Sequence, residues 1–198
     1  LHGAGCAVLS EESGRTGDWH DDAIIVVMDP LDGSTNASRR VPWYATALAA
    51  IDANGQRASL VANQFTNTDR WTATSGGGAL HNGTPISPSP CARLSDAVVG
   101  VSGLPKKHPG WAQFRALGAA ALDICLVAQG TLDGWVDLSS HGVWDYLASV
   151  HICAEAGAVV GEALDRELIV TEHTERRSPI VAATPQLLAA LHNVRNEA

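Results

Sequence analysis

An unbroken apolar run that ends on a group of polar residues constrains the fold of this chain most. Residues 23–28 (Ala-Ile-Ile-Val-Val-Met) have the length and composition of a strand buried on both faces, and Asp-Pro-Leu-Asp-Gly-Ser-Thr follows at residues 29–35. Open α/β sheets hold their ligands at the carboxyl ends of their strands, so we expect Asp29 to end a central strand beside a binding site. Asp-Pro and Asp-Gly are also common turn dipeptides, and a plain strand exit is the competing interpretation.

The chemistry of this segment suits a metal ion and a phosphate group. Asp29 and Asp32 supply hard carboxylate oxygens, which Mg²⁺ prefers. Pro30 fixes the backbone so that the carbonyl of Leu31 can turn toward the same ion. Gly33 lets the backbone approach a ligand that a Cβ would repel. The N–H groups of this glycine and of the two residues after it, which we expect to open a short helix, would face an anion.

A second pattern predicts an amphipathic helix that ends near Gly157. Trp144, Leu147 and Ile152 recur near helical spacing, and a glycine commonly follows the last turn of a helix. Asp145 would lie in the first turn of this helix. The helix dipole favours a carboxylate there, which by itself requires no function.

A third segment completes a recognisable order of motifs. Residues 6–9 (Cys-Ala-Val-Leu) predict a short strand that leads into a Glu-Glu pair at residues 11–12, although adjacent glutamates in a loop are commonly just solvated. The Glu-Glu pair, Asp-Pro-Leu-Asp-Gly-Ser at residues 29–34, and Trp-Asp at residues 144–145 with Glu-Ala-Gly after it resemble the motifs of the inositol monophosphatase family, in the same order. The resemblance runs from about Val8 to the end of the chain.

This resemblance implies a metal-dependent, lithium-sensitive phosphatase that holds two or three Mg²⁺ ions. The implied metal ligands are Glu11, Asp29, the Leu31 carbonyl, Asp32 and Asp145. The implied catalytic residues are Glu11, Asp29 and Ser34, where Ser34 keeps the hydroxyl of the family's usual threonine. The implied substrate contacts are Gly33, Ser34, Thr35, Ala120, Asp137 and Asp145. Asp137 stands where the family often has a glutamate that contacts substrate hydroxyls.

The implied reaction is hydrolysis of a small phosphate monoester by metal-activated water, with inositol monophosphate as the favoured substrate. Histidinol phosphate, fructose 1,6-bisphosphate and a 3′-phosphoadenosine nucleotide are the alternatives, because Asp137 is shorter than the family's glutamate. Two other classes stay open: a catalytically silent metal-binding relative with a regulatory role, and a carboxylate-rich cation-binding module without chemistry. We also expect a homodimer.

Composition agrees with a cytoplasmic enzyme that acts on a small phosphorylated metabolite. A chain of 198 residues that is 45% hydrophobic and 17% charged should bury one sizeable core. The net charge of −8 argues against a nucleic-acid polymer as a partner, because that requires a basic surface. No apolar run reaches membrane-spanning length, so we expect no membrane partner. The four cysteines have no paired spacing, which favours reduced thiols.

The order of predicted elements indicates a layered α/β (α+β) sandwich, of the αβαβα type that the resemblance implies, without the family's N-terminal helices. Residues 1–90 would carry the metal-binding loop and an antiparallel sheet that includes a meander from Trp43 onward. Residues 91–198 would add a smaller mixed sheet and the Trp-Asp motif, and the two halves would form one compact catalytic unit. Without helices before the Glu-Glu pair, one face of the first sheet should expose an apolar surface.

Four local patterns in these halves give sharper expectations. Asn82-Gly83 predicts a hairpin turn, and Thr184-Pro185 predicts the start of the last helix. A further helix is expected over about residues 116–129. A short basic stretch, Lys106-Lys107-His108, could face either a substrate or solvent.

Overall fold

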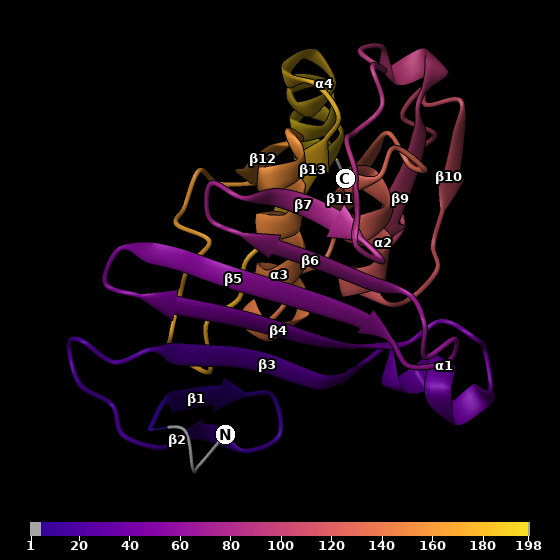
Figure 1. The fold of residues 1–198 in the computed structure, drawn as a ribbon. Helices are drawn as coiled ribbons and strands as arrows, with labels where there is room; N and C mark the ends of the chain where they lie inside the picture. The colour runs from indigo at the N-terminus through magenta and orange to yellow at the C-terminus, as the bar shows by residue number, and fades with distance from the viewer. Residues whose placement is uncertain (1–4, 198) are drawn as a thin grey trace.

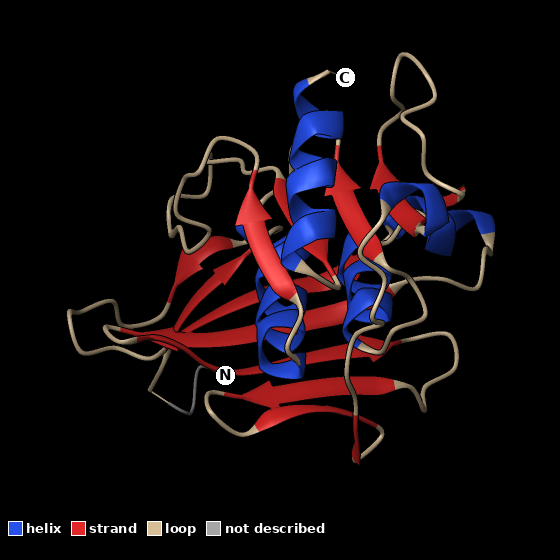
Figure 2. Cartoon of the chain, turned by 90° about the horizontal axis from the view of Figure 1, so that it is seen from above, coloured by secondary structure: helices blue, strands red, loops and turns tan. Residues whose placement is uncertain are grey.

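The chain folds into alternating layers of sheet and helix (Figures 1 and 2). The computed structural model describes residues 5–197. Helices α2 (Ala120–Ala128) and α3 (Val143–Ala156) lie between an eight-stranded and a five-stranded sheet, and α4 (Pro185–Asn196) covers the outer face of the smaller sheet. Figure 1 shows α3 crossing behind the strands of the large sheet. This arrangement confirms the layered α/β fold.

The large sheet holds the first half of the chain. Its strands are β1 (Ala7–Ser10), β2 (Gly14–Thr16), β3 (Ile25–Asp32), β4 (Ala45–Asp52), β5 (Gly55–Asn63), β6 (Arg70–Thr74), β7 (Gly78–His81) and β8 (Thr84–Pro85), in the order β2-β1-β3-β4-β5-β6-β7-β8. The meander from β4 to β8 is antiparallel as expected, and Asn82 and Gly83 form the tight turn between its last two strands with positive φ angles of 51° and 80°.

The expectation of a wholly antiparallel first sheet was wrong at one pair of strands. β1 and β3 are parallel, and the unpredicted strand β2 lies outside β1. The chain leaves β2 through residues 17–24 and re-enters the sheet on the other side of β1, running in the direction of β1. The carboxyl ends of β1 and β3 therefore lie side by side, with Ser10 opposite Met28.

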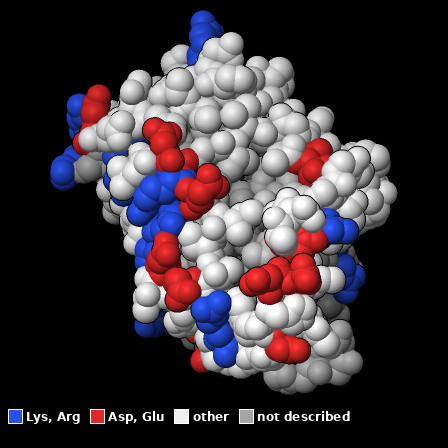
Figure 3. Space-filling view, turned by 90° about the vertical axis from the view of Figure 1, so that its left-hand side faces the viewer, with Lys and Arg blue, Asp and Glu red and all other residues white. Residues whose placement is uncertain are grey.

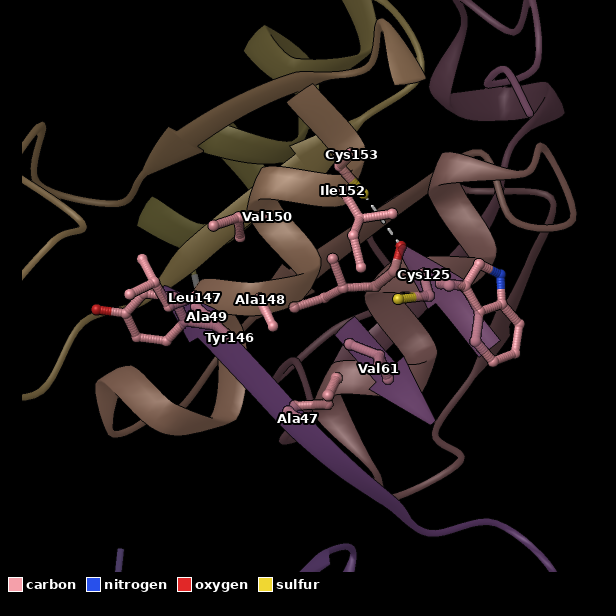
Figure 4. Packing of buried hydrophobic residues seen from close by; sticks show 14 of the residues in the cluster. Ala47, Ala49, Val61, Cys125, Tyr146, Leu147, Ala148, Val150, Ile152 and Cys153 are labelled. Carbon is pink, nitrogen blue, oxygen red and sulfur yellow. Dashed lines mark hydrogen bonds between the residues drawn. The ribbon is translucent and has the colours of Figure 1, made fainter. Parts of the chain in front are cut away.

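Side chains on the two faces of the large sheet differ in how they are covered. Along β4 every second residue is buried, beginning with Ala45, because these residues face α2 and α3. Figure 4 shows Ala47 and Ala49 of this buried face beneath α3. The opposite face carries a cross-strand row of half-buried residues formed by Met28, Leu48, Leu60, Thr72 and Leu80. Helices α2 and α3, which contact the sheet, lie on its other side.

The second sheet is mixed, as expected. Its strands are β9 (Val98–Ser102), β10 (Gln113–Arg115), β11 (Gly134–Asp137), β12 (Val159–Glu162) and β13 (Pro179–Ala182), in the order β10-β9-β11-β13-β12. Strands β10, β9 and β11 run parallel to one another, and β13 pairs antiparallel with both β11 and β12. Thr184 caps α4 by accepting a hydrogen bond from the N–H of Leu187, which confirms the predicted start of that helix.

The predicted helix over residues 116–129 begins later than expected. Gly118 has a φ of +86° and Ala119 is extended, so α2 starts at Ala120. The cause is tertiary, because the side chain of Asp32 accepts a hydrogen bond from the N–H of Ala121 at 2.8 Å and so binds the first turn of α2 to the end of β3. The short 3₁₀ helix over Leu94–Asp96 and strand β10 were not predicted.

Charged side chains of both signs are mixed on the face of the molecule that Figure 3 shows, with wide uncharged areas between the groups. None of the four cysteines forms a disulfide bond in the described part of the chain, and Cys153 donates to the carbonyl of Ile124 at 3.2 Å where α3 meets α2 (Figure 4). Among residues 5–197, no helix combines the length and the apolar composition that crossing a bilayer requires.

Candidate metal centre and substrate cavity

Three carboxylates from distant parts of the sequence meet at the carboxyl ends of β1 and β3. Glu11 follows β1, Asp29 lies near the end of β3, and Asp145 lies in the first turn of α3. One oxygen from each side chain lies within 4.8 Å of the other two. Asp29 is buried, Asp145 is half-buried and Glu11 is exposed, so the group opens toward solvent on one side. Hard oxygens at this spacing suit a divalent cation such as Mg²⁺.

The backbone of β3 bends where these carboxylates are needed. Its register with β4 shifts between Asp29 and Asp32, because Pro30 has no N–H to donate to the ladder. The N–H of Leu31 donates instead to Oδ1 of Asp29 at 2.8 Å, which fixes that carboxylate and leaves its other oxygen for a ligand. Gly33 then turns the chain into helix α1 (Ser34–Arg39) with a φ of +81°.

The electrostatics of the three carboxylates favour a bound cation. Burial, together with the negative charges of Glu11 and Asp145, raises the pKa of Asp29 to about 7, against the hydrogen bond from the N–H of Leu31, which lowers it. Burial likewise raises the pKa of Asp145 to about 6, although the N–H of Gly142 donates to its Oδ2 at 2.8 Å. Carboxylates that resist ionisation in this way are stabilised by a positive ion among them. The donor set therefore fits a metal, and it is a functional-site candidate on electrostatic grounds as well.

The expected ligand Asp32 lies beside the group without belonging to it. Its Oδ2 accepts from Ala121 at the start of α2, and burial raises its pKa well above the ordinary value, with further help from the charge of Asp29. Asp32 and Leu31 line the same cavity of about 240 Å³ as the three carboxylates. The structure thus brings the five expected metal ligands to one cavity and gathers three of them into a close cluster.

The expected phosphate-binding segment lines the same cavity. Gly33, Ser34 and Thr35 face it at the beginning of α1. Ala120 lies on a neighbouring cavity of about 220 Å³, which shares Asp32, Gly118 and His141 with the first one. A ligand can therefore place its phosphate beside the carboxylates and its remaining atoms in the second cavity.

Asp137 is not placed to contact a substrate directly. Its side chain is fully buried, and it lines neither of these two cavities. Its Oδ2 is 2.7 Å from Nδ1 of His141, and its Oδ1 accepts from the N–H and the hydroxyl of Ser139 at 2.8 and 2.9 Å. Asp137 therefore holds the imidazole of His141 in place.

His141 is a site residue that the sequence reasoning missed. It lines both cavities, and its Nε2 lies 3.5 Å from the hydroxyl of Ser102. Burial lowers the pKa of His141, but the hydrogen bond and charge of Asp137 outweigh burial, and the net shift is upward. No local pattern marked His141, because it lies in the loop between β11 and α3 and its contact with Asp137 depends on how that loop packs.

Asp123 was missed for a different reason. It is buried in α2, accepts from Nε1 of Trp43 at 2.7 Å and lines the second cavity. Burial raises its pKa to about 7. An aspartate within an apolar helix carries no local signal of its partner, because Trp43 comes from the first half of the chain.

The basic stretch at residues 106–108 does not face these cavities. Lys106, Lys107 and His108 line a separate cavity of about 350 Å³ beside the end of α4. Nζ of Lys107 is 2.8 Å from a carboxylate oxygen of Glu197, and both side chains are largely exposed. Such an exposed ion pair contributes little to stability.

Comparisons with known proteins show which family the chain resembles over almost its whole length. Residues 4–198 match the inositol monophosphatase family. The Nus factor SuhB of Escherichia coli K12 is 31% identical over 207 residues, which cover 96% of this chain and 74% of that protein. The fructose-1,6-bisphosphatase/inositol-1-monophosphatase of Methanothermobacter thermautotrophicus is 30% identical over 195 residues, which cover 89% of this chain and 70% of that protein.

Solved structures show the same fold. A hypothetical protein from Pyrococcus horikoshii, described as similar to inositol-1 monophosphatase, superposes with a TM-score of 0.85 at 28% identity and covers 97% of this chain and 77% of its own. An inositol monophosphatase–fructose 1,6-bisphosphatase superposes with a TM-score of 0.86 at 27% identity, covering 96% and 77%. With its motifs, its fold and its sequence in agreement, the chain belongs to the inositol monophosphatase family.

Proposed function

We propose that this chain hydrolyses a small phosphate monoester with two or three Mg²⁺ ions, and that inositol monophosphate is its substrate. The observation that carries the proposal is the cluster of Glu11, Asp29 and Asp145 beside a second, partly polar cavity. Leu31 and Asp32 would complete the ligand set, since both line the cluster's cavity. Lithium would inhibit the enzyme by entering one of the metal positions.

The residues around the cluster would have different roles in the reaction. Bound Mg²⁺ supplies a low pKa for the attacking water and charge stabilisation for the phosphoryl oxygens. Glu11 and Ser34, which both line the cavity, would orient the water. The N–H groups at the start of α1 donate to the phosphoryl oxygens, and Gly33 lets the phosphate approach them because it has no side chain. Asp145 would hold a metal ion on the side of the leaving group.

The second cavity would hold the leaving group. Ser102, Asp123 and His141 line it with both donors and acceptors, which suits the hydroxyl groups of a polyol. Asp137 would act on the substrate through His141, because it fixes the ring that faces this cavity. This placement replaces the direct contact between Asp137 and the substrate that the sequence favoured.

A panel of phosphate esters tests the proposed substrate. Initial rates of phosphate release with Mg²⁺ would be measured for inositol 1-phosphate, histidinol phosphate, fructose 1,6-bisphosphate, a 3′-phosphoadenosine nucleotide and an aryl phosphate. We expect kcat/KM to be highest for inositol 1-phosphate. A higher value for another ester would reassign the substrate while keeping the hydrolase, and no release from any ester would contradict both.

A catalytically silent relative is the second candidate, and the name of the Escherichia coli relative, a Nus factor, favours it. Such a chain would bind metal at the same carboxylates and act through contacts with another protein. Calorimetry with Mg²⁺ separates the two, because metal binding without any phosphate release would support the silent relative. Light scattering of the same sample would test the proposed homodimer.

A further inference from the structure

We propose that a separate cavity of about 450 Å³ binds the phosphate group of a small anionic ligand. Three arginines line it, namely Arg166 and Arg176 from the segment between β12 and β13, and Arg195 from the last turn of α4. Ser139, Ser140 and Ser178 add polar groups to the wall. None of these residues lines the two cavities of the catalytic centre.

The charges around this cavity suit a dianion. Arg166 is paired with the buried Glu162, whose two oxygens it contacts through Nε and Nη2. Within residues 5–197, neither Arg176 nor Arg195 forms a close ion pair with a carboxylate, although the charge of Arg176 lowers the pKa of Asp145, and no acidic residue lines the cavity. The wall therefore carries positive charge that no residue of the wall itself neutralises, in a chain whose net charge is −8, and this suits a phosphate monoester with its charge of roughly −1.5 to −2.

Arg195 also has donors without acceptors. Its Nε is buried and makes no hydrogen bond in the described structure. Its Nη2 makes only long contacts, 3.4 Å to the carbonyl of Ser139 and 3.5 Å to the hydroxyl of Ser178. A buried N–H without a partner is costly, and a guanidinium presents its N–H groups as a fork that matches two phosphate oxygens. A phosphate in the cavity would satisfy this fork.

A simpler explanation for Arg195 is that the helix dipole favours a positive charge at the carboxyl end of α4. This explanation does not cover Arg176, which comes from another segment and lines the same cavity. Arg176 is already held in position, since its Nη1 donates to the carbonyls of His173 and Glu175 at 2.9 Å each and its guanidinium lies 5.2 Å from the Trp144 ring. Arginines fixed in this way lose little entropy when an anion binds.

This cavity adjoins the network that positions His141. Ser139 lines the cavity and also donates twice to Asp137, which holds the imidazole of His141. An anion that contacts Ser139 or Ser140 therefore touches the loop that shapes the substrate cavity. The inference does not depend on catalysis, because it concerns binding to a site away from the metal ligands.

Titration of the metal-free chain with inorganic phosphate, followed by NMR of the arginine Nε–H groups, tests the proposal. Without metal, the carboxylate cluster repels anions, so binding there is suppressed. We expect the Arg195 Nε–H resonance to shift saturably. The R195K and R176Q variants should each weaken phosphate binding roughly tenfold or more, since each removes hydrogen bonds to a charged group. The R93Q variant is the matched control, because Arg93 is exposed and pairs with Asp96.

The outcomes separate the possible sources of the phosphate. Equal affinity for inorganic phosphate and for glycerol phosphate would support a site that accepts the phosphate of a larger metabolite. Binding of inorganic phosphate alone would support a site for the free ion. No saturable shift of Arg195, or equal affinity in R195K, R176Q and R93Q that all retain the circular dichroism of the parent chain, would overturn the proposal.

Discussion

Ser34 separates hydroxyl chemistry from backbone geometry at the candidate centre. Its hydroxyl is assigned to orienting the attacking water and its N–H to the phosphate. Ser34→Ala should therefore lower kcat by roughly tenfold to a hundredfold while the fold is kept, and Ser34→Thr should keep most of the activity because it restores the hydroxyl. Steady-state rates on the preferred ester measure both. Equal losses in the two variants would show that the position matters through packing instead.

His141 and Asp137 should act as one unit on the substrate. His141→Ala should lower kcat/KM on a polyol phosphate by about tenfold to a hundredfold, the value of a hydrogen bond to a charged group, and should spare an aryl phosphate that has no hydroxyls. Asp137→Asn should cause a similar loss because it releases the ring. The double variant should be no worse than the single ones.

The control for this pair is the aryl phosphate itself. If either substitution lowers its turnover as much as that of the polyol phosphate, the pair supports the metal site or the fold. If Asp137→Asn lowers the polyol rate while His141→Ala does not, Asp137 acts on the substrate by a route other than the ring.

Gly33 joins strand β3 to helix α1 at a point where a side chain would be crowded. A Cβ there would lie 3.0 Å from the Cβ of Ala119 and 3.1 Å from the carbonyl oxygen of Trp43, and φ is +81°. Gly55 is the matched control, because its φ is +106° but a Cβ would meet nothing within 4 Å. Gly55→Ala should cost only the backbone strain, about 1–2 kcal/mol. Gly33→Ala should cost more and should abolish activity.

Chemical denaturation and phosphate release measure this difference. The comparison isolates crowding, since both variants share the strain of a positive φ. Equal free energies of unfolding together with full activity in Gly33→Ala would mean that the close approach at this turn has no role in the site.

The elements that carry the site were predictable to different degrees. Strand β3 and helix α3 follow from an apolar run and from helical spacing, which are local patterns, and both were predicted. The late start of α2 was not, because it depends on the bond between Asp32 and Ala121, which are distant in the sequence. The parallel pairing of β1 with β3 likewise has no local signal.

At the scale of the whole molecule, the parallel pairing of β1 with β3 determines where the candidate metal centre forms. It is what brings Glu11 beside Asp29, and only the family resemblance anticipated that these residues meet. The carboxylates were predictable as residue types suited to a metal. The contact of Asp137 with His141 and the contact of Asp123 with Trp43 were not predicted, because each depends on how loops and helices pack after folding.

The whole chain should respond to pH through its buried carboxyl groups. Burial raises the pKa of Asp29 and Asp123 to about 7 and that of Asp145 to about 6. A carboxyl with a raised folded pKa binds more protons in the folded state, so its contribution to stability falls as pH rises from the ordinary value toward the folded one. Without metal, the melting temperature should therefore fall between about pH 5 and about pH 7.

Other groups do not reverse this trend. His141, whose pKa is raised, changes stability in the same direction, while His151, whose pKa burial lowers, opposes it as a single group. Glu162, with a pKa lowered to about 2, is ionised throughout this window. Differential scanning calorimetry of the metal-free chain measures the trend, and added Mg²⁺ should reduce it because the ion competes with protons. A melting temperature that rises across the window would contradict this account of the carboxylates.

Phosphate release with and without Mg²⁺, in the parent chain and in the Asp29→Asn variant, tests the central claim most directly. The parent chain should release phosphate from its preferred ester with Mg²⁺, lose that activity in excess chelator and regain it when Mg²⁺ is restored. Asp29→Asn should fold but lose activity by orders of magnitude, since an amide supplies neither the charge nor the second oxygen that the ions need. Full activity in chelator, or in Asp29→Asn, would contradict a metal-dependent hydrolase built on these three carboxylates.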